Sequence, residues 1–404
     1  MAEAAEGDDA NPHHHGSHQD LLDEPDLPTA TAVIDAIIVP TARPSAQLNT
    51  AIGYARELGC ALLALCSKDS SASDVFRLGE QAGIDVVAID VDKIPADSGL
   101  LPDFATTATL ATRRRFPDRR DTATKRNLAL LFAALVGWER VFFLDDDITV
   151  DDVGVLRAAG SALSGYHLAG LRVDEFPDNS VVCHAGRELG RPQQTFIGGG
   201  ALAVDLTKAA GSFFPQVYNE DWFFLLDDKG LRPTVIAGKA RQERYDPYYS
   251  RARARYEEVG DTLAEGVFWL LDDGGKVNDA TEKHWGMFLD ERRAFIVELL
   301  DAVDESGLSK LRRMKIRGAL NAALRRNRRI SAEFCAGYLQ DWLADRTRWR
   351  EHVTDWQAKY RAYLHAADRL DDWPPRTALT VLNLLDCARY LRCEVSRSSS
   401  APAV

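Results

Sequence analysis

The sequence lacks the features that mark several common classes of protein. Its 404 residues include only six cysteines, with no C-x-x-C pair and no zinc-type spacing. The longest apolar run, Leu128 to Trp138, is too short to cross a bilayer. The first thirty residues have neither the basic start nor the apolar centre of a signal peptide. We therefore expect reduced, buried cysteines and a cytoplasmic protein without a transmembrane segment.

Positive charge is also scarce. The chain has 61 acidic residues against 49 lysines and arginines, a formal net charge of −12. A general nucleic-acid-binding protein needs a basic face that replaces phosphate counterions, so we expect no nucleic-acid partner. Residues 1–28 contain eight acidic residues and no lysine or arginine. This composition predicts a disordered acidic tail over residues 1–30, and a second disordered tail is expected over 396–404.

Between the tails, residues 31–250 alternate short apolar runs with helical patterns. The apolar runs predict buried strands at 36–40, 61–66, 85–89 and 140–144. Continuous apolar strands separated by helices predict an α/β fold, with a mainly parallel sheet that helices cover on both faces. Pro40-Thr41-Ala42-Arg43 stands after the first strand, where a dinucleotide-binding domain would have a glycine-rich phosphate loop. This counts against a dinucleotide-binding Rossmann domain.

After residue 251 the pattern becomes helical throughout, which predicts an all-α C-terminal extension over 251–395. The expected helices are Ala252–Leu271, Thr281–Val303, Lys310–Arg325, Ala332–Trp342, His352–Ala367 and Thr377–Leu391. Two interpretations stay open. The helices either bind an acceptor or join two copies in a homodimer, or they form a structural cap on the sheet domain.

Three adjacent carboxylates end the fourth expected strand, in the stretch Val141–Val150 (VFFLDDDITV). The carboxyl ends of strands are where open α/β sheets bind ligands. Adjacent carboxylates repel one another unless a cation or hydrogen-bond donors neutralise them. If the backbone stays extended, Asp145 and Asp147 point to one side and Asp146 to the other. Such hard oxygen ligands suit Mg²⁺ or Mn²⁺, whereas an acidic loop that leads into Asp151 and Asp152 is the alternative.

Over residues 33–245 the sequence resembles the family 2-like glycosyltransferases of the GT-A fold. The matching pieces occur in the family's order: Val39-Pro40-Thr41, Thr124-Lys125-Arg126-Asn127, Leu144-Asp145-Asp146-Asp147, Phe196-Ile197-Gly198-Gly199-Gly200-Ala201 and Tyr218-Asn219-Glu220-Asp221-Trp222. The resemblance implies a transferase that moves a sugar from a nucleotide-diphosphate donor to a hydroxyl acceptor, with inversion at the sugar carbon. It also implies Mg²⁺ or Mn²⁺ as a cofactor.

The resemblance assigns roles residue by residue. Asp147 would bind the metal directly, and Asp145 would contact it through water or hold the ribose. Asp221 would be the general base, and Glu220 would orient it or the acceptor. The glycines Gly198, Gly199 and Gly200, together with Trp222, would line the acceptor side. The expected donor-binding residues are Pro40, Thr41, Arg43, Asp69, Lys125, Arg126, Asp145, Asp146, Arg241 and Arg244.

One departure from the family concerns the metal. Many related enzymes supply a further ligand, often histidine, after the E-D motif, but here no histidine follows Asp221 until His284. Gln242 or Glu243 occupies the corresponding region.

The same residues also fit other functions. Asp145-x-Asp147-x-Thr149 also fits haloacid-dehalogenase-like phosphatases, in which Asp145 would be the nucleophile, with Asp272-Asp273 and Asn278-Asp279 as the later acidic motif. That family places its motif on the first strand, whereas three β-α units precede it here. A nucleotidyltransferase and a sugar-nucleotide-binding module without turnover are the remaining alternatives.

Overall fold

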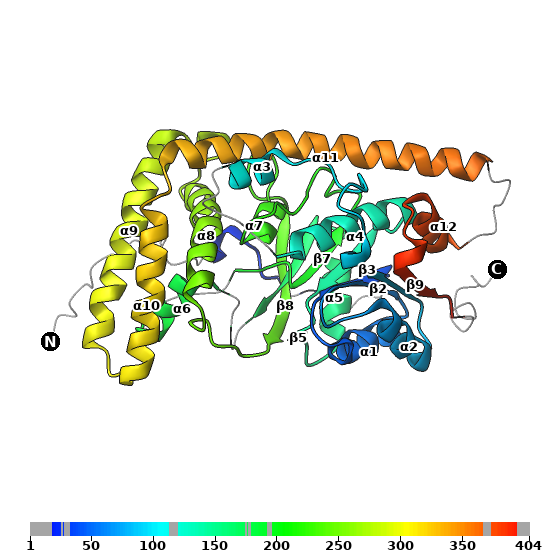
Figure 1. Cartoon of the computed structure of the whole chain (residues 1–404), viewed down its shortest axis with the longest axis horizontal. Coiled ribbons are helices and arrows are strands. Elements are labelled where there is room, and N and C mark those ends of the chain that lie inside the picture. The colour runs from blue at the N-terminus through cyan, green and yellow to red at the C-terminus, as the bar shows by residue number, and fades with distance from the viewer. Residues whose placement is uncertain are drawn as a thin grey trace. The chain divides into compact units, whose positions relative to one another are not determined.

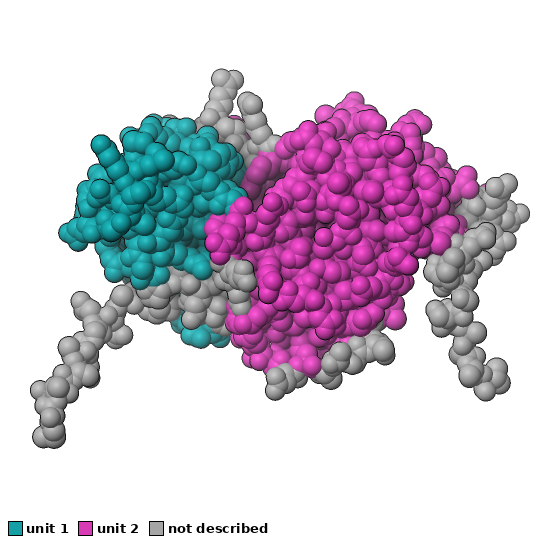
Figure 2. Space-filling model, turned by 90° about the horizontal axis from the view of Figure 1, so that it is seen from below, with its two compact units in different colours: residues 1–21, 179–196, 245–337 teal, residues 22–178, 197–244, 338–404 magenta. Residues whose placement is uncertain are grey.

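The computed structural model describes residues 18–25, 27, 33–112, 120–173, 176, 179–191, 196–366 and 373–393 (Figure 1). The chain forms two compact units, and each is built from separate stretches of sequence (Figure 2). Unit 1 contains residues 1–21, 179–196 and 245–337, and unit 2 contains residues 22–178, 197–244 and 338–404. The sequence predicts one boundary near residue 250, whereas the chain passes from one unit to the other several times.

Unit 2 is built on a mixed sheet of nine strands in the order β5-β8-β6-β7-β4-β1-β2-β3-β9. The central strands β4, β1, β2 and β3 are parallel, as are β6 and β8, whereas β7, β5 and β9 pair antiparallel with their neighbours. The parallel centre agrees with the predicted α/β class. The strands are β1 (Ala36–Thr41), β2 (Ala61–Cys66), β3 (Val86–Asp90), β4 (Arg140–Leu144), β5 (Ile148–Thr149), β6 (Leu168–Val173), β7 (Ala201–Asp205), β8 (Thr234–Gln242) and β9 (Ala388–Leu391).

Helices cover the central strands because these strands are apolar on both faces. Alternate residues of β1, such as Ile37 and Val39, join a core that includes residues of α1 (Asn49–Leu58), α2 (Ala72–Ala82) and α5 (Gly154–Ala162). The helix α4 (Thr122–Val136) also contacts β1 and β2, and α12 (Pro374–Val381) packs against α4. The remaining short elements of unit 2 are α3 (Ala105–Thr112), α7 (Glu220–Phe224), and the 3₁₀ turns η3 (Ser45–Leu48), η4 (Val91–Lys93) and η6 (Leu385–Cys387).

Unit 1 is helical in the part that the structure describes. Its helix α10 packs against three others, α6, α8 and α9, around a core that includes Ile296, Leu299 and Leu320. Its elements are α6 (Val181–Glu188), α8 (Arg251–Asp272), α9 (Glu282–Glu305), α10 (Lys310–Asn327) and the 3₁₀ turns η2 (Gln19–Leu21) and η5 (Val277–Asp279).

The expected helices after residue 251 need two corrections. The segments expected at 332–342 and 352–367 form one continuous helix, α11 (Ala332–Ala366). The segment expected as a helix over 377–391 ends in the strand β9, so the expectation of an all-α extension is wrong there. Figure 1 shows β9, in red, beside β3, with which it pairs antiparallel from Ala388 to Leu391.

The expected tails lie largely outside the described residues, but residues 18–25 make specific contacts. In unit 2, Asp23 forms a bridge with Val235, and its carbonyl accepts a hydrogen bond of 2.9 Å from Ile236 N. In unit 1, His18 is buried. Within the described residues, every helix is too short or too polar to span a membrane.

Candidate functional site

The three carboxylates after β4 are arranged by a tight turn. Ile148 N donates to Asp145 O at 3.1 Å, which places Asp146 and Asp147 at the centre of a β-turn. The predicted alternation of side chains required an extended backbone, so it does not hold. Asp146 and Asp147 both face Arg43, whereas Asp145 faces Arg126.

Arg43 is the cation beside the second and third carboxylates. It follows β1, and its Nη2 donates to Asp147 Oδ2 at 2.8 Å, while Nη1 lies 3.4 Å from Asp146 Oδ1 and 3.7 Å from Glu243 Oε2. The side chains of Asp146 and Asp147 are 8% and 10% exposed, against 43% for Arg43. Burial raises the pKa of Asp146, although hydrogen bonding from Thr41 Oγ1 at 2.6 Å and the charge of Arg43 oppose this shift. A single guanidinium therefore faces a pair of nearly buried carboxylates and can balance only one of their two negative charges.

Arg126 holds the first carboxylate. Its Nη2 donates to both oxygens of Asp145, at 2.8 and 3.0 Å, and its Nη1 donates to Glu220 Oε1 at 3.0 Å. Burial raises the pKa of Asp145 to about 6 and that of Glu220 to about 7, and Arg126 opposes both shifts. Asp145 and Glu220 therefore share one buried cation, which positions both of them.

Asp221 lies at the start of α7 and is held by backbone donors. Its Oδ2 accepts from Gly199 N at 2.7 Å, and its Oδ1 accepts from Trp222 N at 2.9 Å. The ends of β4 and β7 meet here, because Asp145 N donates to Gly200 O at 2.9 Å. These bonds bring the E-D motif, the glycine segment and the acidic motif to one edge of the sheet.

The three glycines make room for side chains of the site. A Cβ on Gly198 would lie 2.8 Å from Asp221 Oδ2, and one on Gly200 would lie 3.0 Å from Asp145 Oδ2. At Gly199 it would lie 2.7 Å from Arg126 Nη1. Glycine is therefore needed at these positions because the backbone lies close to the site's own acids and arginine. The predicted place of the glycines on an acceptor side stays a prediction.

Lys125 is buried next to Arg126 and has a different role. Its Nζ donates to Thr41 O at 2.7 Å and to Ser67 Oγ at 2.6 Å, and it pairs with Asp121 at 3.0 Å. Burial lowers the pKa of Lys125, and Asp121 opposes that shift. The lysine thus ties the ends of β1 and β2 to α4, and its predicted contact with a donor stays a prediction.

The other predicted donor residues lie around this centre without joining it. Pro40 is part of β1, and Asp69 is exposed, with its N donating to Ala42 O at 3.3 Å. Arg241 pairs with Asp151 at 2.9 Å, and Arg244 is exposed. Their assignment to a donor stays a prediction.

The strand β8 brings two more polar residues to Asp147. Ile148 and Thr149 of β5 pair with Gln242 and Arg241. Gln242 Nε2 lies 3.4 Å from Asp147 Oδ2, and Glu243 N donates to Asp147 O at 3.0 Å. Gln242 and Glu243, which occupy the region where many related enzymes have a histidine, therefore lie beside the acidic motif. Carboxylate and amide oxygens are the donor set that a hard divalent cation prefers, so these residues fit Mg²⁺ or Mn²⁺.

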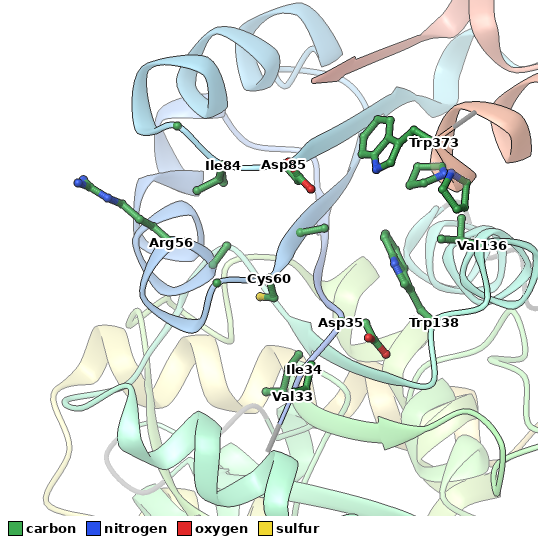
Figure 3. A pocket seen from close by; sticks show the side chains of 16 residues that line it. Val33, Ile34, Asp35, Arg56, Cys60, Ile84, Asp85, Val136, Trp138 and Trp373 are labelled. Carbon is green, nitrogen blue, oxygen red and sulfur yellow. The ribbon is translucent and has the colours of Figure 1, made fainter. Parts of the chain in front are cut away.

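A separate pocket of about 590 Å³ lies at the amino-terminal ends of β1, β2 and β3, with Trp138 and Trp373 in its wall (Figure 3). Its acids have structural partners. Asp35 Oδ2 accepts from Glu139 N and Arg140 N at 2.8 Å each, and Asp85 Oδ1 accepts from Cys393 N at 2.6 Å. None of the predicted site residues lines this pocket.

Sequence reasoning missed a buried charged network in unit 1. Arg292 pairs with Glu258 and Asp261, and all three side chains are at most 3% exposed. His18 donates to Asp272 Oδ2 at 2.5 Å and to Glu265 Oε2 at 2.9 Å. Burial would lower the pKa of His18, but these two hydrogen bonds raise it to about 9. Acidic residues on the apolar helix α8 were the signal that could have revealed this network.

Comparisons with known proteins do not identify a family for this chain. No protein-family model and no curated protein matches the sequence. Among solved structures, the chain is similar to the mannosyltransferase PcManGT from Pyrobaculum calidifontis in complex with GDP-Man and Mn²⁺, at 13% identity and a TM-score of 0.37, over 91% of this chain and 88% of that chain. A TM-score this low does not establish a shared fold, so the inference of function has to come from the residues of this chain.

Proposed function

We propose that the protein is a divalent-cation-dependent glycosyltransferase of the GT-A type, which transfers a sugar from a nucleotide-diphosphate sugar to a hydroxyl acceptor with inversion. The observation that supports this most directly is the set of oxygen ligands at the carboxyl end of β4. Asp146 and Asp147 are nearly buried, and one arginine balances only one of their two charges. Gln242 and Glu243 lie beside them. A buried group of carboxylates is costly unless a cation balances it.

Different residues have different roles in this proposal. Asp147 would hold the cation directly, and Asp145, which Arg126 fixes, would contact it through water or hold the ribose. When bound, Mg²⁺ or Mn²⁺ stabilises the negative charge that develops on the leaving diphosphate. Arg43 supplies a guanidinium that can form paired hydrogen bonds with phosphate oxygens.

Asp221 accepts the proton of the attacking hydroxyl. Its carboxylate is oriented by the N–H groups of Gly199 and Trp222, so the base is held in place before an acceptor arrives. Glu220 acts through Arg126, which it holds against Asp145. Glu220 is therefore a positioning residue.

The phosphatase alternative finds less support. Its nucleophile would be Asp145, but both oxygens of that carboxylate accept hydrogen bonds from the buried Arg126. Asp272, from the later acidic motif of that alternative, is bonded to His18.

Two substitutions test the proposal. Asp147→Asn should abolish metal-dependent binding of nucleotide-diphosphate sugars, because the main metal carboxylate is lost. Asp221→Asn should keep donor binding and stop transfer. Donor binding is measured by thermal shift across a panel of nucleotide sugars with and without Mn²⁺, and transfer by release of nucleoside diphosphate. Full transferase activity in both variants would refute the assignment, and donor binding without turnover for any acceptor would favour a binding module.

A further inference from the structure

Two buried polar atoms beside Asp147 have no hydrogen-bond partner among the described residues, namely Arg43 Nη1 and Gln242 Oε1. The first is a cationic donor and the second is an acceptor. Arg43 Nη1 has only longer ion-pair contacts, with Asp146 at 3.4 Å and Glu243 at 3.7 Å. An unsatisfied buried donor or acceptor destabilises the folded state, and folded proteins contain few of them. Both atoms belong to residues that bond to the same oxygen, Asp147 Oδ2.

The two unsatisfied atoms would bind ligands of opposite charge, an anion at Arg43 Nη1 and a cation at Gln242 Oε1. A divalent cation coordinated by Asp147 could also accept Gln242 Oε1 as a ligand, because amide oxygens suit hard cations. The guanidinium of Arg43 could not stay bonded to the same carboxylate oxygen without repelling that cation. A phosphate oxygen would satisfy Arg43 Nη1 instead.

The carboxylates are more firmly fixed than the arginine. Asp146 accepts from Thr41, and the backbone of Asp147 is held by Glu243 N. Arg43 is 43% exposed and carries its charge on a long side chain that follows the end of β1. A rearrangement at this site is therefore a movement of Arg43.

We infer that Arg43 holds the place of the divalent cation in the ligand-free protein and turns to the diphosphate when metal and donor bind. This rests on the proposed function. The arginine balances part of the negative charge of Asp146 and Asp147 before a ligand arrives. It competes with the metal alone, and it contributes to binding once the diphosphate accompanies the metal. The two ligands are thereby coupled, because each metal ion bound without a donor costs Arg43 its hydrogen bond to Asp147.

The inference predicts effects of opposite sign from one substitution. Arg43→Gln should bind Mn²⁺ alone more tightly than the wild type, by roughly threefold to tenfold, because a competing cation is gone. In the presence of saturating Mn²⁺, the same variant should bind a nucleoside diphosphate about tenfold more weakly, because a charge-assisted hydrogen bond is lost. Arg43→Lys should bind Mn²⁺ nearly as weakly as the wild type, since it keeps the competing charge.

Mn²⁺ affinity is measured on the full chain by electron paramagnetic resonance of the free ion, and diphosphate affinity by calorimetry. Arg77→Gln is the matched control, because it removes one positive charge from α2, where Arg77 pairs with Asp74 and not with the site. Unchanged or weaker Mn²⁺ binding in Arg43→Gln would overturn the inference. If Asp147→Asn also left Mn²⁺ binding unchanged, the proposed function itself would fail. If Asp147→Asn abolished it, only the role of Arg43 would be rejected.

Discussion

Replacing Gly199 by alanine should damage both the stability of the protein and the proposed sugar transfer. The added Cβ would lie 2.7 Å from Arg126 Nη1 and 2.9 Å from Asp221 Cβ. Arg126 is 3% exposed and bonded to Asp145 and Glu220, and Asp221 Cβ is fixed by the backbone of α7. Neither atom can yield without loss of a hydrogen bond or a shift of the helix. Overpacking of this kind costs about 1–3 kcal/mol.

The measurement is a urea denaturation midpoint together with the rate of nucleoside diphosphate release. Gly199→Ala should lower both. Gly53→Ala is the matched control, because Gly53 lies in α1 with no atom within 4 Å of the added Cβ. Alanine is favoured over glycine inside a helix by about 0.5–1 kcal/mol, so this control should be slightly stabilised. If Gly199→Ala unfolded at the same urea concentration as Gly53→Ala, the glycines would not be serving the packing of Arg126 and Asp221.

Two further substitutions test buried charges. Arg126→Met leaves Asp145 and Glu220 without their shared cation and should lower the free energy of unfolding by about 3–5 kcal/mol, measured by urea denaturation. Combining Arg126→Met with Glu220→Gln should recover part of this loss. An unchanged urea midpoint in the single variant would show that the arginine is not needed for stability. His18→Ala should destabilise unit 1 in a pH-dependent way, because the folded-state pKa of His18 is raised from 6.5 to about 9. The stabilisation by His18 is fully present below the unfolded-state pKa and is lost as the pH rises through 9. The difference in urea midpoint between wild type and variant should therefore shrink as the pH rises from about 6.5 to 9. A difference that grew instead would contradict the pairing of His18 with Asp272 and Glu265.

The sequence predicts the centre of the sheet well because its strands are apolar along their whole length. β2 and β4 have the predicted bounds, β1 is one residue longer at its carboxyl end, and β3 is shifted by one residue at both ends. β9 was expected to be helical. Its four residues, ARYL, have no continuous apolar pattern, and their extended form depends on pairing with β3, which lies far away in the sequence. Such non-local pairing cannot be predicted from the local spacing of apolar residues.

Within the candidate site, the sequence points to the acids but not to the side chains that pair with them. The adjacent residues Lys125 and Arg126 looked alike as cations at the start of a helix. Neighbouring helix positions differ by about 100° in direction, and this sends Lys125 to the ends of β1 and β2 and Arg126 to Asp145. The turn at Asp146 and Asp147 was also hidden, because no glycine or proline marks it. The direction of each carboxylate therefore required the structure.

The pairing of β9 with β3 affects how the chain can fold as it is synthesised. β3 emerges from the ribosome early, and the unpaired N–H and C=O groups along one edge of this apolar strand have no partner until residues 388–391 are made. An exposed edge of this kind invites pairing with other chains. A chain that is cut before residue 388 would keep that edge open, so we expect nascent and truncated forms to aggregate, and to depend on chaperones, more than the full-length protein does.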